Sequence, residues 1–456
     1  MTRHLLPPEP IETLDAYLAT ETGGLGLERA TQLGPAATID EIVASGLRGR
    51  GGGGFPTGRK WRSVASAGAV GTRYAVCNGA EGEPGTFKDR ALMRANPYQL
   101  VEGVIIAAYA MGAADAFIAL KEKFTVEYER VTRAVQEMQA AGICSECTVT
   151  IVSGPEEYLF GEEKALLEVI EGKPPLPRLF PPYEHGLFAS DIVTGWEPSP
   201  GQPSPNPTLV NNVETLSTVP HILAKGSAWY RSMGTAASPG TLVCTVVGDV
   251  VAPDVGEIEL GTSLGDVIDV VGSGVGAGRR VKAVLSGVAN AVVTDLSTPV
   301  SYEGFEAAGS GLGSAGFIVY DDTACMVEAA RSASRFLYVE SCGQCPPCKL
   351  GSGEITGRLQ RIEAGVGDEH DLRTIDYWLD RVTDGNRCYL AVEEAVVVRS
   401  LVTAFPDEIA EHAALGHCPR PRALPLPVIT DLRDGVARLD ERLARKQADW
   451  TYIGGS

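Results

Sequence analysis

A short run of cysteines in the last third of the chain has the spacing of metal ligands. Cys342, Cys345 and Cys348 follow one another in the segment ESCGQCPPCKL, and Cys388 in NRCYL is a candidate for a fourth ligand. Iron–sulfur clusters are typically held by four cysteines, and a dense triplet with one distant partner is a common arrangement. A structural zinc site with the same four sulfurs is the alternative, although zinc sites more often use two separated C-x-x-C pairs. The spacing therefore favours a [4Fe–4S] cluster.

A glycine-rich segment near the N-terminus has the composition of a nucleotide-binding loop. Residues 46–61 read GLRGRGGGGFPTGRKW. Consecutive glycines let the backbone approach a flat or phosphorylated ligand and present its amides, and the cations at Arg48, Arg50, Arg59 and Lys60 suit phosphate. No G-K-[ST] ending of a P-loop is present, and the aromatic residues distinguish the segment from a flexible linker. A flavin, a nicotinamide nucleotide and a nucleoside triphosphate all remain open as ligands.

The other cysteines and the histidines form no comparable pattern. Cys144 and Cys147 make a C-x-x-C pair without a second pair nearby, so we expect two reduced cysteines at a strand edge. Cys325 and Cys418 stand alone, and the six histidines, His412 among them, are isolated and predicted to be surface or core residues. Since no Ser–His–Asp or Cys–His set is apparent, the sequence predicts neither a nucleophile nor a general base.

Alternating strand-like and helix-like segments surround these motifs. In the first half, the predicted strands are residues 74–78, 115–121 and 147–153, and the predicted helices are residues 97–112, 125–141 and 162–171. Such alternation is typical of a parallel sheet covered by helices.

The rest of the chain has different sequence patterns. Val-rich strands separated by Gly-rich turns over residues 241–321 indicate a small β-rich module, and residues beyond 324 have a helical pattern, clearest over 391–405. The proline-rich residues 174–207 are predicted to form a long, ordered loop. A charged helix is predicted over residues 434–448.

Bulk composition limits the class of protein. The 456 residues allow roughly three domains, and the net charge of −19 argues against a nucleic-acid-binding surface. The first ten residues contain no secretory signal, and the longest apolar stretch, residues 103–120, includes Asp115 and suits a buried helix and strand better than a membrane span. We therefore expect a cytoplasmic protein without direct membrane insertion, which meets a membrane only through partners.

Seven blocks of the chain, in order, resemble the flavoprotein subunit of respiratory complex I and the related diaphorase subunits of NAD-linked hydrogenases and formate dehydrogenases. They are GLRGRGGGGFPTGRKW, CNGAEGEPGTFKDR, EYLFGEEKALLEVIEGK, PTLVNNVETL, DDTACMVEAA, ESCGQCPPCKLG and NRCYLAVEEAVVVRSLVTAFPDE. The resemblance implies an α/β Rossmann-like domain over residues 1–235 that binds FMN and NAD(H). It further implies a soluble-ligand-binding β-grasp domain (240–322) and a helical bundle holding a [4Fe–4S] cluster (324–415), while residues 416–456 form a C-terminal extension.

The resemblance also implies roles for individual residues. Cys342, Cys345, Cys348 and Cys388 match the cluster ligands. The positions that match the FMN pocket are Gly49, Arg50, Gly51, Lys60, Asn78, Thr208, Asn211 and Asn212. Other positions match acidic, aromatic or glycine residues beside the flavin and the nicotinamide nucleotide: Phe55, Glu81, Glu83, Tyr158, Gly161, Glu162 and Glu163. Among these, Glu81 and Glu83 are the candidate catalytic residues. A solvated acidic face is the alternative for the glutamates.

Several positions depart from the family pattern in the nucleotide half of the site. The chain has Ala80 where the family has Asp, Ser63 where it has a second aromatic residue, Phe160 where it has Cys and Phe180 where it has Lys. Loss of one aromatic face weakens the stacking of an adenine, for which Phe180 and Tyr183 offer a replacement surface. NADH, NADPH and the absence of nucleotide turnover are therefore all open.

The resemblance implies hydride transfer between NAD(H) and FMN, followed by single-electron transfer through the [4Fe–4S] cluster to partner subunits. Expected partners are a thioredoxin-like [2Fe–2S] subunit and a further iron–sulfur or catalytic subunit. The alternative function is a flavin/iron–sulfur relay or scaffold subunit that has lost nucleotide turnover.

Overall fold

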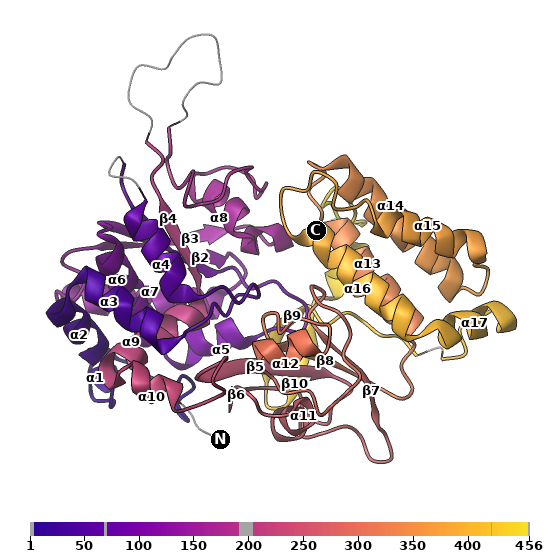
Figure 1. Ribbon diagram of the computed structural model, residues 1–456, viewed down its shortest axis with the longest axis horizontal. Helices are drawn as coiled ribbons and strands as arrows, with labels where there is room; N and C mark the ends of the chain where they lie inside the picture. Colours follow the sequence, from indigo (N-terminus) through magenta and orange to yellow (C-terminus); the bar gives the residue numbers. More distant parts are fainter. Residues whose placement is uncertain (1–3, 68–70, 191–203, 421, 455–456) are drawn as a thin grey trace, which may run out of the picture.

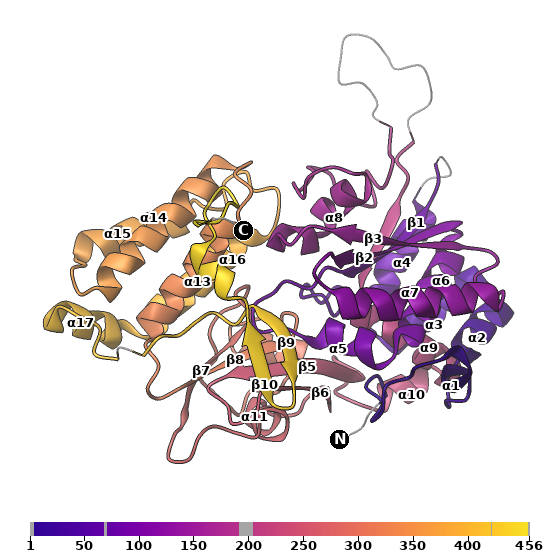
Figure 2. The ribbon, with the colours of Figure 1, turned by 180° about the vertical axis from the view of Figure 1, so that it is seen from behind.

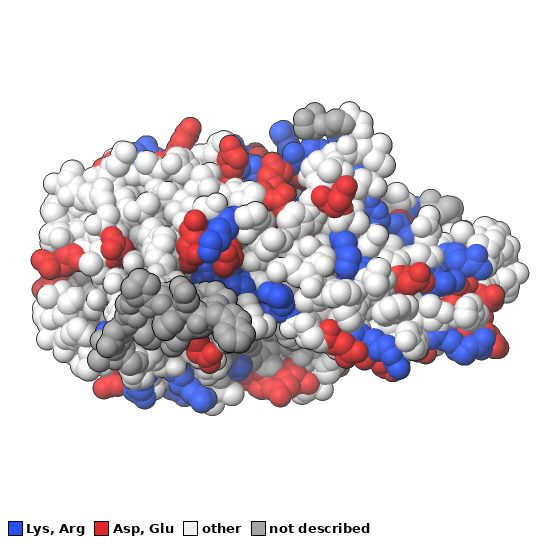
Figure 3. Space-filling model, turned by 90° about the horizontal axis from the view of Figure 1, so that it is seen from above, with Lys and Arg blue, Asp and Glu red and all other residues white. Residues whose placement is uncertain are grey.

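Three structural units follow one another along the chain: a parallel α/β unit, a mixed β unit and a helical unit (Figure 1). The computed structural model describes residues 4–67, 71–190, 204–420 and 422–454. The last residues return from the helical unit to the other two (Figure 2). On the face shown in Figure 3, acidic and basic side chains are interspersed.

The α/β unit is built on a parallel sheet in the order β3–β2–β1–β4. Its strands are β1 (Tyr74–Gly79), β2 (Asp115–Lys121), β3 (Thr148–Gly154) and β4 (Thr208–Asn212). Its helices are α1 (Leu14–Leu18), α2 (Leu25–Leu33), α3 (Pro35–Ser45), α4 (Thr57–Ser66), α5 (Lys88–Ala95), α6 (Pro97–Met111), α7 (Thr125–Ala140), α8 (Glu163–Ile170), α9 (Val213–Lys225) and α10 (Ser227–Arg231), with the 3₁₀ turn η1 (Tyr158–Gly161). The predicted alternation is confirmed, and each predicted boundary lies within one residue of the observed one.

Both faces of this sheet are covered, as the period of two residues along a strand requires. On β1, Ala75 and Cys77 belong to the large core beneath α6 and α9, whereas Val76 packs on the other face with Phe160 and Leu166. The carboxyl ends of the four parallel strands meet at one edge, so Gly79 and Asn212 lie at the same edge. Of the predicted proline-rich loop, residues 191–203 lie outside the described residues, and residues 174–190 contain no helix or strand.

The mixed β unit contains a four-stranded sheet in the order β6–β5–β8–β7. Its elements are β5 (Thr241–Gly248), β6 (Asp254–Glu259), α11 (Leu264–Gly272), β7 (Val281–Ser286), α12 (Tyr302–Ala307) and β8 (Gly316–Asp321). Strands β5 and β8 are parallel, and the two outer pairs are antiparallel. The small β-rich module predicted over 241–321 is thereby confirmed.

The helical unit comprises α13 (Met326–Glu340), α14 (Pro346–Glu363), α15 (Glu369–Leu379), α16 (Leu390–Ala404) and α17 (Pro406–Leu415). Helix α13 packs between α14 and α16, with Ala333 and Leu337 in the shared core. No helix of the described residues is both long and apolar enough to cross a bilayer.

The predicted charged helix over residues 434–448 is wrong. This part of the chain forms the hairpin β9 (Ile429–Arg433) and β10 (Val436–Leu439), followed by the 3₁₀ turn η2 (Glu441–Arg445). Asp434 and Gly435 both have positive φ, 51° and 73°, which is the geometry that makes Asp-Gly a signal for two-residue hairpin turns. This dipeptide outweighs the helical preference of the charged residues around it.

The C-terminal segment, residues 416–420 and 422–454, contacts all three units. The Gly85 N–H donates to the Pro427 carbonyl (2.7 Å), and Arg90 Nη1 donates to the Ile429 carbonyl (2.7 Å). Lys446 forms a buried ion pair with Glu340 at the end of α13 (2.7 Å). Figure 2 shows the hairpin lying across the mixed β unit.

A buried histidine beneath α9 gives the fold a predictable response to acid. His221 bonds Thr22 Oγ1 (3.1 Å) and Gln99 Oε1 (3.0 Å), and burial lowers the pKa of His221 from 6.5 to about 3. Between these values the unfolded chain holds the additional proton, so the stabilisation is complete above pH 6.5 and is lost as the pH falls toward 3. Over this window the free energy of unfolding should fall by roughly 4 kcal/mol more in the wild type than in His221→Gln. Chemical denaturation at a series of pH values measures this, and the exposed His417→Gln should follow the wild type.

Candidate functional site

The four cysteines singled out in the sequence line one pocket. Cys342 and Cys345 lie in the loop between α13 and α14, Cys348 lies in the first turn of α14, and Cys388 precedes α16. Pro346 at the start of α14 suits the first helical turn, where no N–H is needed. The pocket is also lined by Leu159, Ser341, Gly343, Asn386, Arg387, Leu390 and Ala391. The structure therefore brings together the triplet and the distant cysteine.

The separation of these sulfurs distinguishes the two metal groups that the spacing allows. A tetrahedral zinc ion with bonds of about 2.3 Å holds its sulfurs roughly 3.8 Å apart. Among the described residues, these cysteines do not form a group of three or more whose ligand atoms lie within 4.8 Å of one another. Burial raises the pKa of Cys348 to about 12, so a bound metal group would have to stabilise the thiolate that coordinates it. The pocket fits a cubane rather than a single ion.

The glycine-rich loop connects α3 to α4 and lies against the carboxyl end of β4. The Arg50 N–H donates to Thr215 Oγ1 (2.9 Å), and a Cβ at Gly51 would lie 3.2 Å from the Asn212 Cβ. Gly52 has φ +117°, a conformation that side chains disfavour, and a Cβ at Gly53 would meet nothing within 4 Å. An open backbone cradle thus faces the carboxyl edge of a parallel sheet, where ligands of open α/β sheets bind. It fits a flat, phosphorylated cofactor such as FMN.

The Arg50 side chain does not extend into this cradle. It is buried and donates to the hydroxyls of Tyr302 and Tyr230 (both 2.9 Å) and to the Thr241 carbonyl (3.0 Å). The guanidinium therefore anchors the loop to α10, α12 and β5, and only the backbone of Arg50 remains for a ligand.

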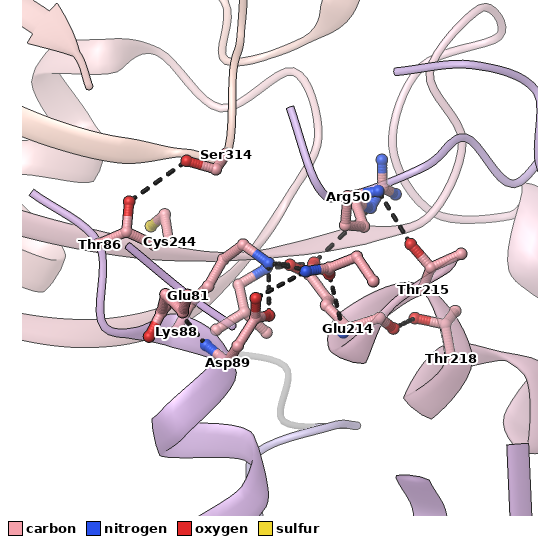
Figure 4. Close-up of polar contacts among 12 residues, drawn as sticks. Arg50, Glu81, Thr86, Lys88, Asp89, Glu214, Thr215, Thr218, Cys244 and Ser314 are labelled. Atoms are coloured by element: carbon pink, nitrogen blue, oxygen red, sulfur yellow. Dashed lines mark hydrogen bonds and ion pairs between the residues drawn. The ribbon is translucent and has the colours of Figure 1, made fainter. Parts of the chain in front are cut away.

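A buried ionic cluster supports the same edge (Figure 4). Lys88 Nζ lies 2.7 Å from Asp89 Oδ1 and 2.9 Å from Glu214 Oε2, and Glu214 Oε1 also accepts the Val243 N–H (2.9 Å). Asn212 donates to Asp89 Oδ2 (2.6 Å) and accepts from Lys88 Nζ (3.2 Å). Burial raises the pKa of Asp89 to about 6. Sequence reasoning placed Asn212 here but missed Lys88, Asp89, Glu214 and Thr215, whose charged or polar side chains gave no signal of burial.

The two candidate catalytic glutamates are partly buried and already paired. Glu81 binds Arg90 Nε (2.8 Å) and accepts the Asp89 N–H (3.0 Å). Glu83 accepts the Val288 N–H (2.6 Å) and the Tyr158 hydroxyl (2.5 Å), and burial raises the pKa of Glu83. Both line a cavity shared with Tyr158 and with residues of α13 and the C-terminal segment. A solvated acidic face is therefore the wrong interpretation of these two residues.

The Tyr158 hydroxyl extends this group to the helical unit. The hydroxyl oxygen also lies 3.2 Å from Glu393 Oε2 on α16, and burial raises the pKa of Glu393 well above its usual range. Sequence reasoning missed Glu393 because it lies among apolar residues, whose pattern predicts a helix of the hydrophobic core.

The remaining acidic and polar positions flank the glycine loop. Lys60 pairs with Glu163 (2.7 Å), and Glu162 caps α8, with its pKa raised to about 7 by burial. Asn78 Nδ2 donates to the Gly161 carbonyl (2.7 Å), and Asn211 Oδ1 accepts from Trp61 Nε1 (2.8 Å).

Thr208 does not join the other predicted FMN positions. It lies at the opposite end of β4 from Asn211 and Asn212. Its hydroxyl donates to the Asn206 carbonyl (3.0 Å) and accepts the Leu187 N–H (2.9 Å). The structure therefore does not bring the Thr208 side chain together with Asn211 and Asn212.

The departures from the family pattern alter the surroundings of the loop in different ways. Phe160 is fully buried and Ala80 nearly so, whereas Ser63 is exposed. Phe55, Phe180 and Tyr183 are respectively 55%, 53% and 47% exposed. Three aromatic side chains are thus accessible to a ligand. Position 63 has no aromatic side chain, because Ser63 stands where the family pattern has an aromatic residue.

The two halves of the site match two known protein regions. Residues 42–221 match the Nuo51 FMN-binding domain, and residues 328–412 match the NADH-ubiquinone oxidoreductase-F iron-sulfur binding region. An open glycine loop on a parallel sheet, beside four convergent cysteines, defines a flavin- and iron–sulfur-binding class of protein.

Comparisons over the whole chain are more specific. An NADH-quinone oxidoreductase subunit of Rhizobium meliloti (strain 1021) is 38% identical over 419 residues, covering 88% of this chain and 96% of that protein. The NADP-reducing hydrogenase subunit HndC of Solidesulfovibrio fructosivorans is 33% identical, covering 90% and 82%. A crystal structure of NAD+-reducing [NiFe]-hydrogenase in the H2-reduced state superimposes with a TM-score of 0.75 at 32% identity, covering 91% of this chain and 68% of that one. The chain belongs to the NADH-quinone oxidoreductase-F family, which includes the related hydrogenase subunits.

Proposed function

We propose that the protein is the electron-input subunit of a larger redox complex, oxidising NADH at FMN and passing single electrons through a [4Fe–4S] cluster to partner subunits. One observation carries the proposal. In the four-residue turn η1, the Gly161 carbonyl bonds Asn78 beside the glycine loop, while Leu159 lines the cysteine pocket. A single turn thus separates the two candidate cofactor positions.

Each group of residues has a defined task in this function. FMN, when bound, supplies the conversion of two-electron to one-electron transfer. The backbone of residues 49–53 and Asn211 and Asn212 hold and orient the flavin, and Cys342, Cys345, Cys348 and Cys388 hold the cluster. Glu83 and Tyr158, fixed by their mutual hydrogen bond (2.5 Å), form the wall between the α/β and helical units. Since both line the cavity between these units, they limit the access of water to it.

We assign the α/β unit (1–235) to the Rossmann-like class and the mixed β unit (240–322) to the β-grasp class, with residues 324–415 as the cluster-binding bundle. The partners that fit an electron-input subunit are a thioredoxin-like [2Fe–2S] subunit and a further iron–sulfur or catalytic subunit, located in the cytoplasm or at the periphery of a membrane. Identification of the polypeptides that co-purify with the chain tests this assignment.

Anaerobic addition of NADH to the purified protein tests the reaction. Rapid bleaching of the bound flavin is expected, and NADPH in a parallel sample establishes which nucleotide is used. The absence of bleaching with both nucleotides, in protein that contains FMN, would contradict the reaction and support a relay or scaffold subunit. Ser63 and Phe180, in place of an aromatic residue and a lysine, are the observations that favour this second function.

Filling the glycine cradle is expected to displace the flavin without unfolding the protein. A Cβ at Gly49 would meet only the Phe55 backbone, at 3.5 Å and 3.8 Å, outside its own chain neighbours, which is ordinary contact. We therefore expect the remaining side-chain atoms of Gly49→Leu to occupy the cradle. Overpacking of this kind costs about 1–3 kcal/mol, or roughly a ten- to hundredfold loss of FMN affinity. Flavin titration into the apoprotein measures the loss. Gly357→Leu, at an open position in α14, should bind FMN normally; equal affinities in the two variants would place the flavin elsewhere.

A further inference from the structure

A second group of metal-ligating side chains lies outside the site described above. Cys325, His412 and Cys418 come together although 87 residues separate the first two. Their ligand atoms all lie within 4.8 Å of one another, and Cys325 Sγ lies 3.4 Å from His412 Nε2. The sequence-based prediction that these residues stand alone is therefore wrong.

The geometry points to a zinc site formed by Cys325, His412 and Cys418. In tetrahedral zinc coordination, bonds of about 2.3 Å to sulfur and 2.0–2.1 Å to nitrogen place neighbouring ligand atoms roughly 3.5–3.8 Å apart. The ligand atoms of the observed group lie within 4.8 Å of one another, whereas the cysteines of the cluster pocket form no such group among the described residues. Two thiolates and one imidazole suit zinc in charge and softness. Cys418 is partly exposed, so the fourth coordination position would be open to water.

The surroundings of His412 orient it as a ligand. The imidazole is fully buried, and Nδ1 lies 2.6 Å from the Glu408 carbonyl one turn earlier in α17. That carbonyl can only accept, so Nδ1 carries the proton and the Nε2 lone pair points to Cys325. Zinc-bound histidines almost always use the second ring nitrogen in this way. A buried histidine that served only for packing would need no pair of cysteines around its free nitrogen.

The position of the site indicates what zinc stabilises. Cys325 caps the start of α13, His412 lies in α17, and Cys418 begins the C-terminal segment. One zinc ion would thus join the helical unit to the beginning of the C-terminal segment, whose later residues contact Arg90 and Glu340. Since α13 has 15 residues, its rise of 1.5 Å per residue puts the zinc site about 22 Å from the cluster cysteines at its other end. The site therefore serves a structural role separate from electron transfer, and it does not depend on the proposed function.

Metal analysis of the full-length holoprotein tests the proposal. After dialysis against metal-free buffer, we expect about one zinc per chain in addition to iron. X-ray absorption at the zinc edge should show two sulfurs at about 2.3 Å and two nitrogen or oxygen atoms at about 2.0 Å. This measurement is not masked by flavin or iron, and four sulfurs around zinc would instead identify misloaded cluster cysteines and overturn the proposal.

Variants separate the site from the cluster pocket. Cys418→Ser and His412→Gln should lose zinc at least tenfold while keeping iron and FMN, and their C-terminal segments should become more sensitive to proteolysis. Cys147→Ser, which removes a buried cysteine elsewhere, should retain zinc. Wild-type protein without zinc, zinc retention in both ligand variants, or a Cys325–Cys418 disulfide found by mass spectrometry of anaerobically purified protein would each refute the assignment.

Discussion

Replacing Cys388 with alanine is expected to abolish the [4Fe–4S] cluster and leave the flavin in place. Cys388 is the only one of the four pocket cysteines that comes from outside the loop and first turn of α14, and the remaining three cannot close the coordination of a cubane that requires four. Iron content should fall from about four atoms per chain to near zero. The electron paramagnetic resonance signal of the reduced cluster should vanish, whereas FMN content and flavin bleaching by NADH should persist.

Cys147→Ala is the control because Cys147 is a buried free cysteine outside both metal groups. It should keep the wild-type iron content. A Cys388→Ala protein that retains four irons and its resonance signal would remove Cys388 from the ligand set. Simultaneous loss of FMN would show instead that the two halves of the site do not fold independently.

The part of the site that sequence reasoning identified is local in the chain. Cys342, Cys345 and Cys348 are predictable because one loop holds them, and the backbone of the glycine loop is predictable because its composition is unusual. Cys388 was only a candidate from the sequence, because it lies far from the triplet, and the resemblance to a family then supported it. Cys325 and His412 could not be paired, since their proximity depends on how α17 packs against the start of α13.

The fold shows the same division between local and long-range information. The strands of the α/β unit were predictable because each is a short apolar run bounded by turns, and the hairpin β9–β10 could have been recognised from Asp434 and Gly435. The burial of charged residues could not. Lys88 and Asp89 are adjacent in a polar segment that reads as solvated, and only Glu214 and Asn212, more than 120 residues later, make their burial possible.

The buried ionic cluster gives the largest expected effect on stability. Glu214 neutralises Lys88 at 2.9 Å and lies 3.6 Å from Arg50 Nε, with all three side chains at most 1% exposed. Glu214→Gln keeps the shape but removes the carboxylate next to both buried cations, so that Lys88 retains Asp89 and Arg50 retains only neutral partners. Breaking a buried pair in this way costs about 3–5 kcal/mol. Urea denaturation monitored in the α/β unit measures the loss, and FMN affinity should fall with it, because Asn212 and the loop backbone lose their support.

The control for this change is an ion pair of similar length at the surface. Asp40 and Arg62 lie 2.6 Å apart, with side chains 67% and 55% exposed, so Asp40→Asn should cost at most about 1 kcal/mol. The double variant Lys88→Met/Glu214→Leu should recover part of the loss by removing opposite charges together, although Asp89 then lacks its lysine. If Glu214→Gln were no more destabilising than Asp40→Asn, the cluster would contribute nothing through its charges, and the position of the glycine loop would have to depend on apolar packing alone.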